Sequence, residues 1–207
     1  ITNPLIVTDR GSRELPFIDL VGSVCHSNGL QSAVFSDVSP NPTDEDIARG
    51  KTVFNNGGHD GVIAIGGGSG MDAGKAISLV GRNDADLWAF DYDQPESPAL
   101  GSESFVPLIC VPTTAGTGAE TESTAMLTDT VQGVKRCIWH TTQKPLLAIL
   151  DPEVTVNLPA DLTAWTGCDA LVHAIEAFSV PDWNPLCDGL ALEAIRLISG
   201  SLESAVA

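Results

Sequence analysis

The stretch G-V-I-A-I-G-G-G-S-G-M-D-A-G-K-A, residues 61–76, decides the fold of this sequence. Residues 62–65 are apolar and mostly β-branched, which is typical of a strand buried on both faces. Three glycines follow this strand directly, and an apolar pattern of helical period begins just after them. Because a turn with so few side chains leaves backbone N–H groups open at the positive end of a helix, the stretch predicts a phosphate-binding turn.

Two phosphate-binding motifs compete for this turn. The NTPase motif G-x-x-x-x-G-K-[ST] fits Gly74-Lys75, but Ser69 stands where it requires glycine and Ala76 where it requires a hydroxyl. The G-x-G-x-x-A form of the dinucleotide fingerprint fits residues 68–73. We therefore interpret the turn as a dinucleotide-binding site, with a plain tight connection between strand and helix as the alternative.

The composition limits the class of protein. A length of 207 residues allows one large domain or two modest ones, and 43% hydrophobic with 18% charged residues indicates a globular chain. Ten lysines and arginines against 27 acidic residues leave a net charge of −17, which argues against the basic surface that nucleic-acid binding requires. We therefore expect no nucleic-acid partner.

Cysteine usage and hydropathy bear on the cellular location. The five cysteines are an odd number without a C-x-x-C pair, so neither a disulfide framework nor a zinc ribbon is indicated. Reduced thiols are typical of the cytoplasm, and we expect a cytoplasmic protein. No signal peptide is visible and no apolar run reaches the roughly 18 residues of a membrane span, so we expect no membrane partner.

Strand and helix patterns alternate along the first two thirds of the chain. Strands are expected at 4–8, 32–35, 62–65, 105–111 and 146–150, and helices at 13–28, at 44–57 and after the glycine turn. This order predicts an α/β fold with a Rossmann-like, doubly wound parallel sheet. A short hairpin is expected from residues 123–128 and 137–140, with Lys135-Arg136 between its strands.

The character of the chain changes after Asp151-Pro152. Two helical patterns, 162–178 and 186–207, follow without a further strand. We expect a dinucleotide-binding α/β domain over 1–152 and the beginning of an all-helical metal-binding domain over 153–207. Since the first residue is not Met and the last lies inside a helical pattern, we also expect the chain to be truncated at both ends.

A second constellation, G-C-D-A-L-V-H-A-I-E-A at 167–177, carries candidate metal ligands. Asp169 and His173 are four residues apart, so they share one helix face, and both residue types bind divalent cations. By spacing alone, a surface Asp–His pair or a satisfied core histidine is the commoner outcome. Two ligands also do not complete a metal site, which needs three or four.

Three motifs occur in order along the chain: Gly66-Gly-Gly-Ser69-x-x-Asp72-x-x-Lys75, Pro112-Thr-Thr-Ala-Gly-Thr117 and Gly167-x-Asp169-Ala-x-x-His173. Together they resemble the iron-containing, or group III, alcohol dehydrogenases, a family that includes lactaldehyde reductase and 1,3-propanediol dehydrogenase. The resemblance covers essentially the whole chain. It implies an N-terminal dinucleotide domain, a C-terminal helical domain and an active site between them.

The resemblance implies cofactor-binding residues on several segments. The NAD(P) pyrophosphate would lie on the turn of Gly67, Gly68, Ser69, Gly70, Met71 and Asp72. The neighbouring loop would line the cofactor with Thr113, Thr114, Ala115, Gly116 and Thr117. The nucleotide would also be contacted by Asn41, Met126 and Lys135. The alternatives for these three are an asparagine that orders its turn, a core methionine and a solvated lysine.

Asp9 follows the first expected strand, at the position where the family places an acid against the adenosine ribose. A carboxylate there accepts hydrogen bonds from the 2′-hydroxyl and repels a 2′-phosphate. We therefore expect NAD to be preferred over NADP.

The implied function is a metal-dependent alcohol dehydrogenase that transfers a hydride between NAD(P) and a small primary alcohol, diol or aldehyde. Asp169 and His173 would be catalytic as ligands of Fe²⁺ or Zn²⁺. The family's two further histidine ligands lie outside these 207 residues, so a non-catalytic nucleotide-binding fragment stays an alternative. A dehydroquinate-synthase-like or maleylacetate-reductase-like enzyme is a further alternative. We also expect a homo-oligomer, namely a dimer.

Overall fold

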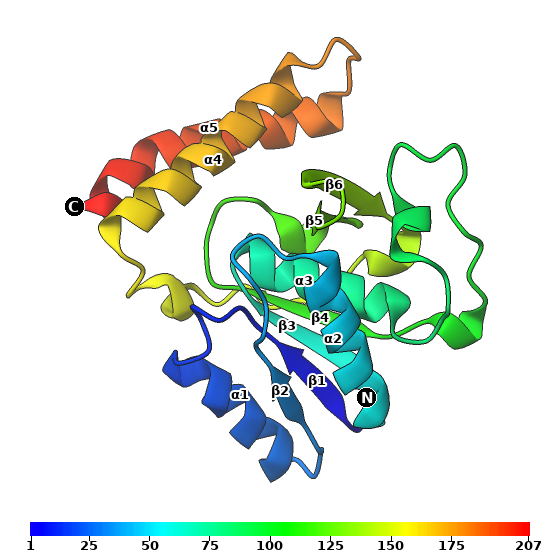
Figure 1. The fold of residues 1–207 in the computed structure, drawn as a ribbon. Helices are drawn as coiled ribbons and strands as arrows, with labels where there is room; N and C mark the ends of the chain where they lie inside the picture. The colour runs from blue at the N-terminus through cyan, green and yellow to red at the C-terminus, as the bar shows by residue number, and fades with distance from the viewer. The chain divides into compact units, whose positions relative to one another are not determined.

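The computed structural model describes residues 1–207, which divide into two compact units. The first unit comprises residues 1–113 and 119–151, and the second comprises residues 114–118 and 152–207. Figure 1 shows the first unit as strands flanked by helices and the second as a pair of long helices. The short loop 114–118 therefore groups with the helices, although the sequence placed it in the α/β domain.

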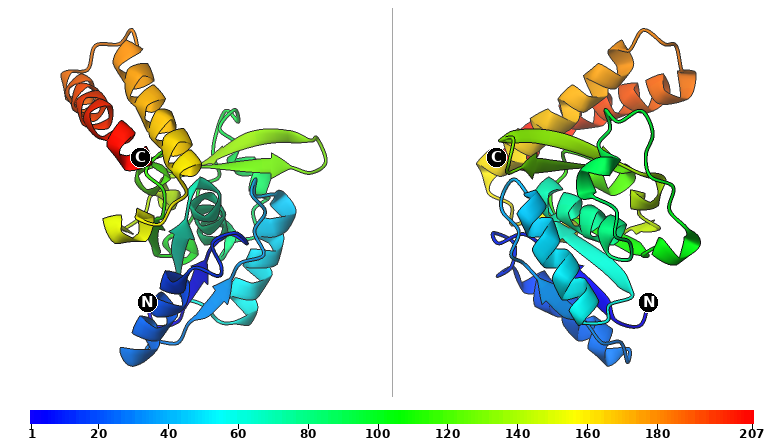
Figure 2. Two further views of the ribbon diagram at one scale, coloured as in Figure 1. Left: turned by 90° about the vertical axis from the view of Figure 1, so that its left-hand side faces the viewer. Right: turned by 45° about the vertical axis from the view of Figure 1, so that its right-hand side comes forward.

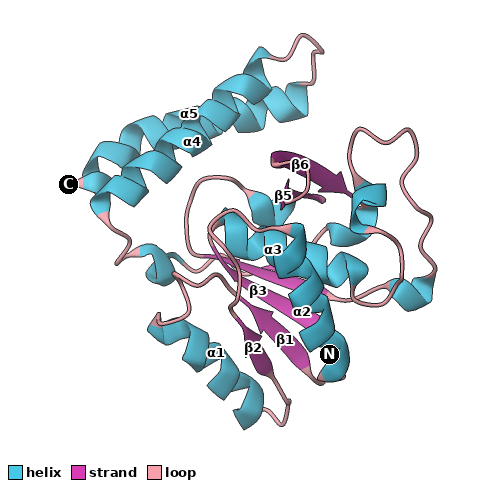
Figure 3. Ribbon diagram, in the orientation of Figure 1, coloured by secondary structure: helices cyan, strands magenta, loops and turns pink.

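The first unit is built on a five-stranded parallel sheet with the order β2-β1-β3-β4-β7. Figure 3 shows strands of this sheet, β2, β1 and β3 among them, in magenta. Its strands are β1 (Pro4–Val7), β2 (Ala33–Phe35), β3 (Gly61–Gly66), β4 (Leu108–Pro112) and β7 (Leu147–Ala148). The predicted α/β fold class is confirmed. The chain runs from β1 outward to β2 and then returns to β3 on the other side of β1, so the strand order reverses between β1 and β3. Ligands of such sheets bind at this switch point, beyond the carboxyl ends of the strands.

Three helices cover the sheet: α1 (Pro16–Ser27), α2 (Asp44–Asn56) and α3 (Gly68–Val80). Helix α2 starts where the sequence predicts, because Thr43 and Asp46 form a capping box in which each side chain accepts from the other's backbone N–H. Helix α1 has no side-chain cap but carries proline in its first turn, where a missing N–H costs nothing.

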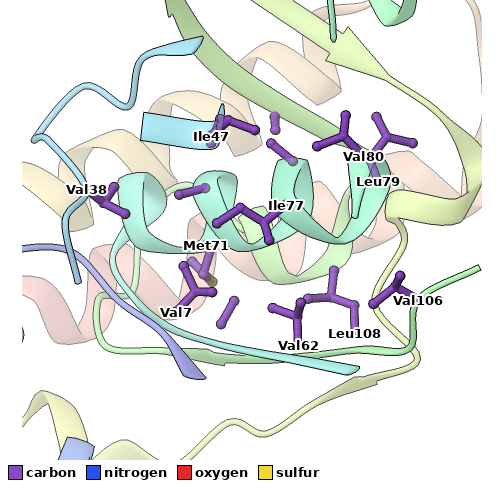
Figure 4. Packing of buried hydrophobic residues seen from close by; sticks show 14 of the residues in the cluster. Val7, Val38, Ile47, Val62, Met71, Ile77, Leu79, Val80, Val106 and Leu108 are labelled. Atoms are coloured by element: carbon purple, nitrogen blue, oxygen red, sulfur yellow. The ribbon is translucent and has the colours of Figure 1, made fainter. Parts of the chain in front are cut away.

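The core of the first unit follows the two-residue alternation of the strands. Val7, Val62 and Leu108 point from the sheet toward Met71 and Ile77 of α3, as Figure 4 shows. Ile6 and Ile65 point to the opposite face, where they form a smaller buried cluster with Ile18 of α1. The sheet is therefore apolar on both faces, which explains why residues 62–65 read as one continuous apolar run.

A two-stranded antiparallel hairpin, β5 (Thr124–Asp129) and β6 (Val134–Trp139), extends from this unit and is clearest in the left view of Figure 2. The predicted position of its turn was wrong, because Lys135-Arg136 lie within β6. Gly133 takes the turn instead with a φ of 68°, and the Asp129 carboxylate accepts from the N–H groups of Val131 and Gln132. A left-handed glycine and an Asp side chain determine this turn, whereas the two charged residues only indicated exposure.

Irregular segments with single helical turns join these elements. Five short 3₁₀ helices occur, at Leu87–Phe90, Ser102–Ser104, Ala119–Thr121, Thr141–Gln143 and Pro152–Thr155. The last sheet strand is shorter than predicted, but the N–H groups of Leu146 and Ile149 on either side of it still donate to β4 carbonyls at 2.9 Å.

The second unit contains α4 (Ala160–Ser179) and α5 (Pro185–Val206), which pack side by side along their length (Figure 1). Asn184 caps α5 by accepting from the N–H groups of Leu186 and Cys187. The two helices approach closely at Gly167, where a Cβ would lie 2.3 Å from Leu202 Cδ1. Neither of these helices, nor any other in the chain, is long and apolar enough to cross a membrane.

Candidate functional site

The N-terminus of α3 lies at the switch point of the sheet, directly after β3. Its N-cap is Gly67, which offers no side-chain cap, and the first helical hydrogen bond runs from the Met71 N–H to the Gly67 carbonyl at 3.1 Å. The N–H groups of residues 68–70 therefore have no partner within the helix. Three such donors at the positive end of a helix dipole can bind an anion such as a phosphate.

Two glycines of the turn are required by geometry. Gly66 has a φ of 153°, and a Cβ on it would lie 3.0 Å from Asp9 Oδ2. A Cβ on Gly70 would lie 3.2 Å from the Ile65 carbonyl and 3.3 Å from the same Asp9 oxygen. A side chain at Gly66 would be strained by the positive φ and would crowd Asp9, and one at Gly70 would press on the Ile65 carbonyl, so neither position accepts a larger residue without rearrangement.

Asp9 lies against this turn, because β1 and β3 are neighbours in the sheet. Its carboxylate accepts from the Ser12 N–H at 2.9 Å and from the Ser12 hydroxyl at 2.8 Å, which orients it toward Gly66 and Gly70. The sequence analysis missed Ser12. The Asp-x-x-Ser spacing, which is typical of a side-chain-bonded turn, was the available signal.

The loop that carries Asn41 also reaches α3. The Ser69 hydroxyl donates to the Pro40 carbonyl, and the Thr128 N–H of β5 donates to the Pro42 carbonyl at 2.8 Å. Asn41 is exposed between these two anchored residues. The structure therefore brings Asn41 to the first turn of α3, from a loop far away in the sequence.

The predicted threonine-rich loop is divided. The buried Thr113 lies at the end of β4, and its N–H donates to the Gly66 carbonyl at 2.9 Å, so it borders the glycine turn. Residues 114–117 belong to the second unit, where a Cβ on Gly116 would lie 3.0 Å from the Thr166 carbonyl of α4. Thr113 is thus the one residue of this loop that belongs to the same unit as the other predicted cofactor residues.

Met126 and Lys135 lie on the exposed face of the hairpin, and Asp72 connects this face to α3. The Met126 N–H donates to Asp72 Oδ2 at 3.2 Å. Burial raises the pKa of Asp72 to about 6, although Lys75, the Met126 N–H and Lys135 all oppose this rise. A carboxyl group with such a pKa changes its charge close to neutral pH.

Asp169 and His173 lie on one face of α4, as the spacing predicted. Asp169 Oδ2 and His173 Nε2 are 3.8 Å apart, and about half of each side chain is exposed. A carboxylate and an imidazole at this separation fit two ligand positions of one divalent cation. No group of three or more His, Cys, Asp or Glu residues in the chain is close enough to hold a metal. The pair can therefore supply part of a ligand set.

The five cysteines are free thiols, and none of them joins these residues as a ligand cluster. Cys110, on β4 behind α3, is buried, and this burial raises its pKa to about 12. Cys168 and Cys187 on the two long helices are exposed. A thiol such as Cys110 stays protonated and does not act as a nucleophile or a metal ligand.

Comparison with known families covers nearly the whole chain. The sequence pattern described as "Iron-containing alcohol dehydrogenase" matches residues 2–152. The pattern described as "Fe-containing alcohol dehydrogenase family, C-terminal" matches residues 163–207.

Similar sequences and structures bear similar names. The chain is 39% identical to an NAD-dependent methanol dehydrogenase of Bacillus methanolicus and 37% identical to a 1,3-propanediol dehydrogenase of Klebsiella pneumoniae; each alignment covers 98% of this chain and 52% of the relative. A solved structure of 1,3-propanediol oxidoreductase superimposes with a TM-score of 0.92 at 36% identity, over 99% of this chain and 52% of that one. A sulfoacetaldehyde reductase from Bifidobacterium kashiwanohense in complex with NAD⁺ superimposes with a TM-score of 0.85 at 32% identity, over 99% and 53%. The chain thus spans about half the length of the relatives it matches.

Proposed function

Because the chain belongs to the iron-containing alcohol dehydrogenase family, we propose that it provides the cofactor site and two metal ligands of an NAD- and metal-dependent alcohol dehydrogenase. One observation carries this proposal. The uncapped N-terminus of α3 stands at the switch point of a parallel sheet, and Asp9, Asn41, Thr113 and the hairpin all gather around it. This is the arrangement that binds the pyrophosphate of a dinucleotide.

Each part of the cofactor site has a defined task. The N–H groups of residues 68–70 would donate to the pyrophosphate, and Gly66 and Gly70 would let it approach the backbone. The Asp9 carboxylate would accept from a ribose hydroxyl, which favours NAD over NADP. The name of one relative, NAD-dependent methanol dehydrogenase, supports this preference. The nicotinamide of the bound cofactor accepts or returns a hydride.

Asp169 and His173 would hold the metal from one side with a carboxylate oxygen and a neutral imidazole nitrogen. A divalent cation in this place would act as a Lewis acid toward an alcohol oxygen. We propose Fe²⁺, as the family description implies, with Zn²⁺ as the alternative because the same ligand types suit both. Two protein ligands would leave the remaining coordination positions of the metal to further ligands and to a substrate oxygen.

We propose a small primary alcohol, or the corresponding aldehyde, as the substrate. The names of three relatives refer to methanol, 1,3-propanediol and 4-hydroxybutyrate, which all carry a primary hydroxyl group. A cytoplasmic homodimer remains our proposal for location and assembly. A metal-free relative with maleylacetate-reductase-like chemistry is disfavoured by the paired Asp169 and His173.

The test combines three measurements on the chain. Fluorescence titration with NADH should show saturable binding, and titration with Co²⁺ or Zn²⁺ should show weak binding that requires Asp169 and His173. A dehydrogenase assay with 1,3-propanediol and added Fe²⁺ then separates a complete enzyme from a nucleotide-binding fragment. For this chain alone we expect the fragment, because its residues form no cluster of three metal ligands. Absence of NADH binding by a folded chain would refute the proposal.

A further inference from the structure

The free edge of β5 is satisfied in an unusual way. β5 pairs with β6 along one edge only, and none of the five strands of the main sheet pairs with the other. Alternate residues of a strand direct their backbone groups to opposite edges, so residues 124, 126 and 128 face the same way. An unpaired edge of this kind leaves hydrogen-bonding groups without partners and invites association with another chain.

Two side chains of α3 take the place of a neighbouring strand along this edge. Lys75 Nζ donates to the Thr124 carbonyl at 2.9 Å, and Asp72 Oδ2 accepts from the Met126 N–H at 3.2 Å. Lys75 thus supplies the donor and Asp72 the acceptor. In a paired sheet, the backbone of a neighbouring strand would supply both groups to this edge. Asp72 and Lys75 can do this because they are three residues apart and share one face of α3.

The edge continues with partners from the segment before α2. The Thr128 N–H donates to the Pro42 carbonyl at 2.8 Å, and the Thr130 N–H donates to Asp44 Oδ1 at 3.3 Å. Partners outside the hairpin therefore follow this edge from Thr124 to Thr130. Only the part beside α3 depends on side chains with opposite charges.

Burial shows how closely these side chains are committed to the hairpin. Lys75 is fully buried, and the side chain of Asp72 is 15% exposed, with 3.8 Å between Lys75 Nζ and Asp72 Oδ1. A charged pair in such a place is costly unless further hydrogen bonds satisfy it. The backbone of β5 provides those hydrogen bonds, which an apolar pair on α3 could not use.

The hairpin face that this edge supports carries two of the predicted nucleotide contacts. Met126 lies opposite Cys137 and Thr128 lies opposite Lys135, so all four share one face of the ribbon. On the other face, Leu127 is fully buried in the main core. The position of Met126 and Lys135 therefore depends on how the hairpin is attached to α3.

We propose that Asp72 and Lys75 are positioning residues that act as a surrogate strand along the free edge of β5 and hold the Met126–Lys135 face against the first turns of α3. The attachment of the hairpin stands on the structure alone. Its effect on the cofactor rests on the proposed function, because Met126 and Lys135 matter to NADH only if they contact it.

The electrostatic surroundings of Asp72 make this attachment sensitive to pH. Burial raises its pKa to about 6; Lys75 of α3 and Lys135 of β6 lower it, and Glu122 raises it. Two thiols also face it, Cys110 and Cys137, and their own pKa values are raised by burial and, to a smaller extent, by the Asp72 charge. Because burial raises this pKa, a carboxylate buried against the hairpin is harder to ionise than one exposed by detachment, so the attachment should weaken as pH rises from about 4 through about 6.

Amide hydrogen exchange measured by NMR tests the proposal without any cofactor. In Asp72→Ala, the edge amides of Met126 and Thr128 should exchange at least about 10-fold faster, because the hairpin can detach locally. The amides of Ala125 and Leu127 point toward β6 and should change much less. Asp72→Asn keeps an acceptor oxygen and should restore most of the protection, but without the change between pH 5 and 7 that the wild type shows.

Lys75→Met provides a second, milder variant, since it keeps the volume of the buried stem and removes only the donor. It should also accelerate exchange at the edge amides. Glu45→Gln, which removes an exposed carboxylate from α2, is the matched control and should leave exchange unchanged. If the edge amides of folded Asp72→Ala and Lys75→Met exchange at the wild-type rate, Asp72 and Lys75 do not position the hairpin.

NADH titration of the same variants then tests the consequence for the cofactor. Lys75→Met, whose residue lies outside the predicted cofactor turn, should bind NADH several-fold more weakly than Glu45→Gln. Faster edge exchange with unchanged NADH affinity would overturn the link to the cofactor and leave the attachment itself established. A wild-type chain that does not bind NADH would refute the proposed function, while the exchange data would still decide the role of Asp72 and Lys75.

Discussion

Two short motifs carry the candidate sites of this chain: the glycine turn of α3 and the Asp169–His173 pair of α4. They differ in how many of the residues that a binding site needs lie around them. The turn is surrounded by the chain's own residues, because Asp9, Thr113, Pro40 and the hairpin all contact the start of α3. The metal pair consists of two half-exposed side chains on one helix without a third ligand. A site made of backbone N–H groups is complete once the sheet folds, whereas a metal site needs side chains from several elements.

Among the variants that test this difference between the two sites, Gly70→Val is expected to have the largest effect. In Gly70→Val the new side chain would press on the Ile65 carbonyl and the Asp9 carboxylate, and so distort the turn whose N–H groups we propose as pyrophosphate donors. We expect NADH affinity to fall at least about 100-fold, which corresponds to about 2.7 kcal/mol. The measurement is fluorescence titration with NADH.

The matched control for this variant is Gly22→Ala in α1, where a Cβ would have nothing within 4 Å. It should bind NADH like the wild type and be slightly more stable, since alanine favours helix over glycine. Unchanged NADH affinity in folded Gly70→Val would show that the glycine turn is not the cofactor site.

The next effect concerns stability and pH at Asp72. Its pKa is raised to about 6 by burial, so the folded state binds a proton more readily than the unfolded state. An acid with a raised pKa contributes most stability at low pH, and this contribution is lost as pH rises from about 4 through about 6. The loss has an upper bound of roughly 3 kcal/mol, from about two pKa units.

Asp72→Asn cannot titrate and isolates this effect. Between pH 4 and 7, the free energy of unfolding of the wild type should fall relative to that of the variant, and the difference should be constant above pH ~7. Urea denaturation at each pH provides the measurement. A difference that grows in favour of the wild type as pH rises would mean that Lys75 outweighs burial and lowers the pKa of Asp72.

A smaller effect is expected at the metal pair, because the chain offers only two ligands. Asp169→Ala and His173→Ala should each weaken the already weak binding of Co²⁺ or Zn²⁺ by about 10-fold or more, followed by calorimetry or by the Co²⁺ absorption spectrum. NADH affinity should stay unchanged in both. Asp161→Asn, at the exposed start of α4, serves as the control. Tight stoichiometric metal in the double variant would place the site elsewhere.

The smallest effect is expected at Asp9, because Asn can keep the acceptor for Ser12 and remove only the charge. The variant Asp9→Asn should relax the preference for NADH over NADPH by about 10-fold, the size of one charge contact. The ratio of the two dissociation constants is the quantity to measure, with Asp19→Asn on the surface of α1 as the control. A wild-type preference for NADPH would contradict the role given to Asp9.

Local patterns were predictable where one short segment decides the outcome. The β-branched run 62–65 became β3, the Thr43–Asp46 box started α2, and the four-residue spacing placed Asp169 and His173 on one helix face. The hairpin turn was misplaced, since only the backbone of Gly133 and the Asp129 carboxylate reveal it. The roles of Ser12 and Lys75 were missed, because each acts on residues brought near by folding.

The sequence by itself determined the main strands and helices, their alternating order, and the glycine turn between β3 and α3. Each of these follows from backbone preference and from the period of apolar residues within a few turns of chain. Only the tertiary structure decided that Asp9 lies against Gly70, that residues 114–118 pack on α4, and that Asp72 and Lys75 occupy the edge of β5. Asp9 and Gly70, 61 positions apart along the chain, meet because the sheet brings the carboxyl ends of β1 and β3 to one edge.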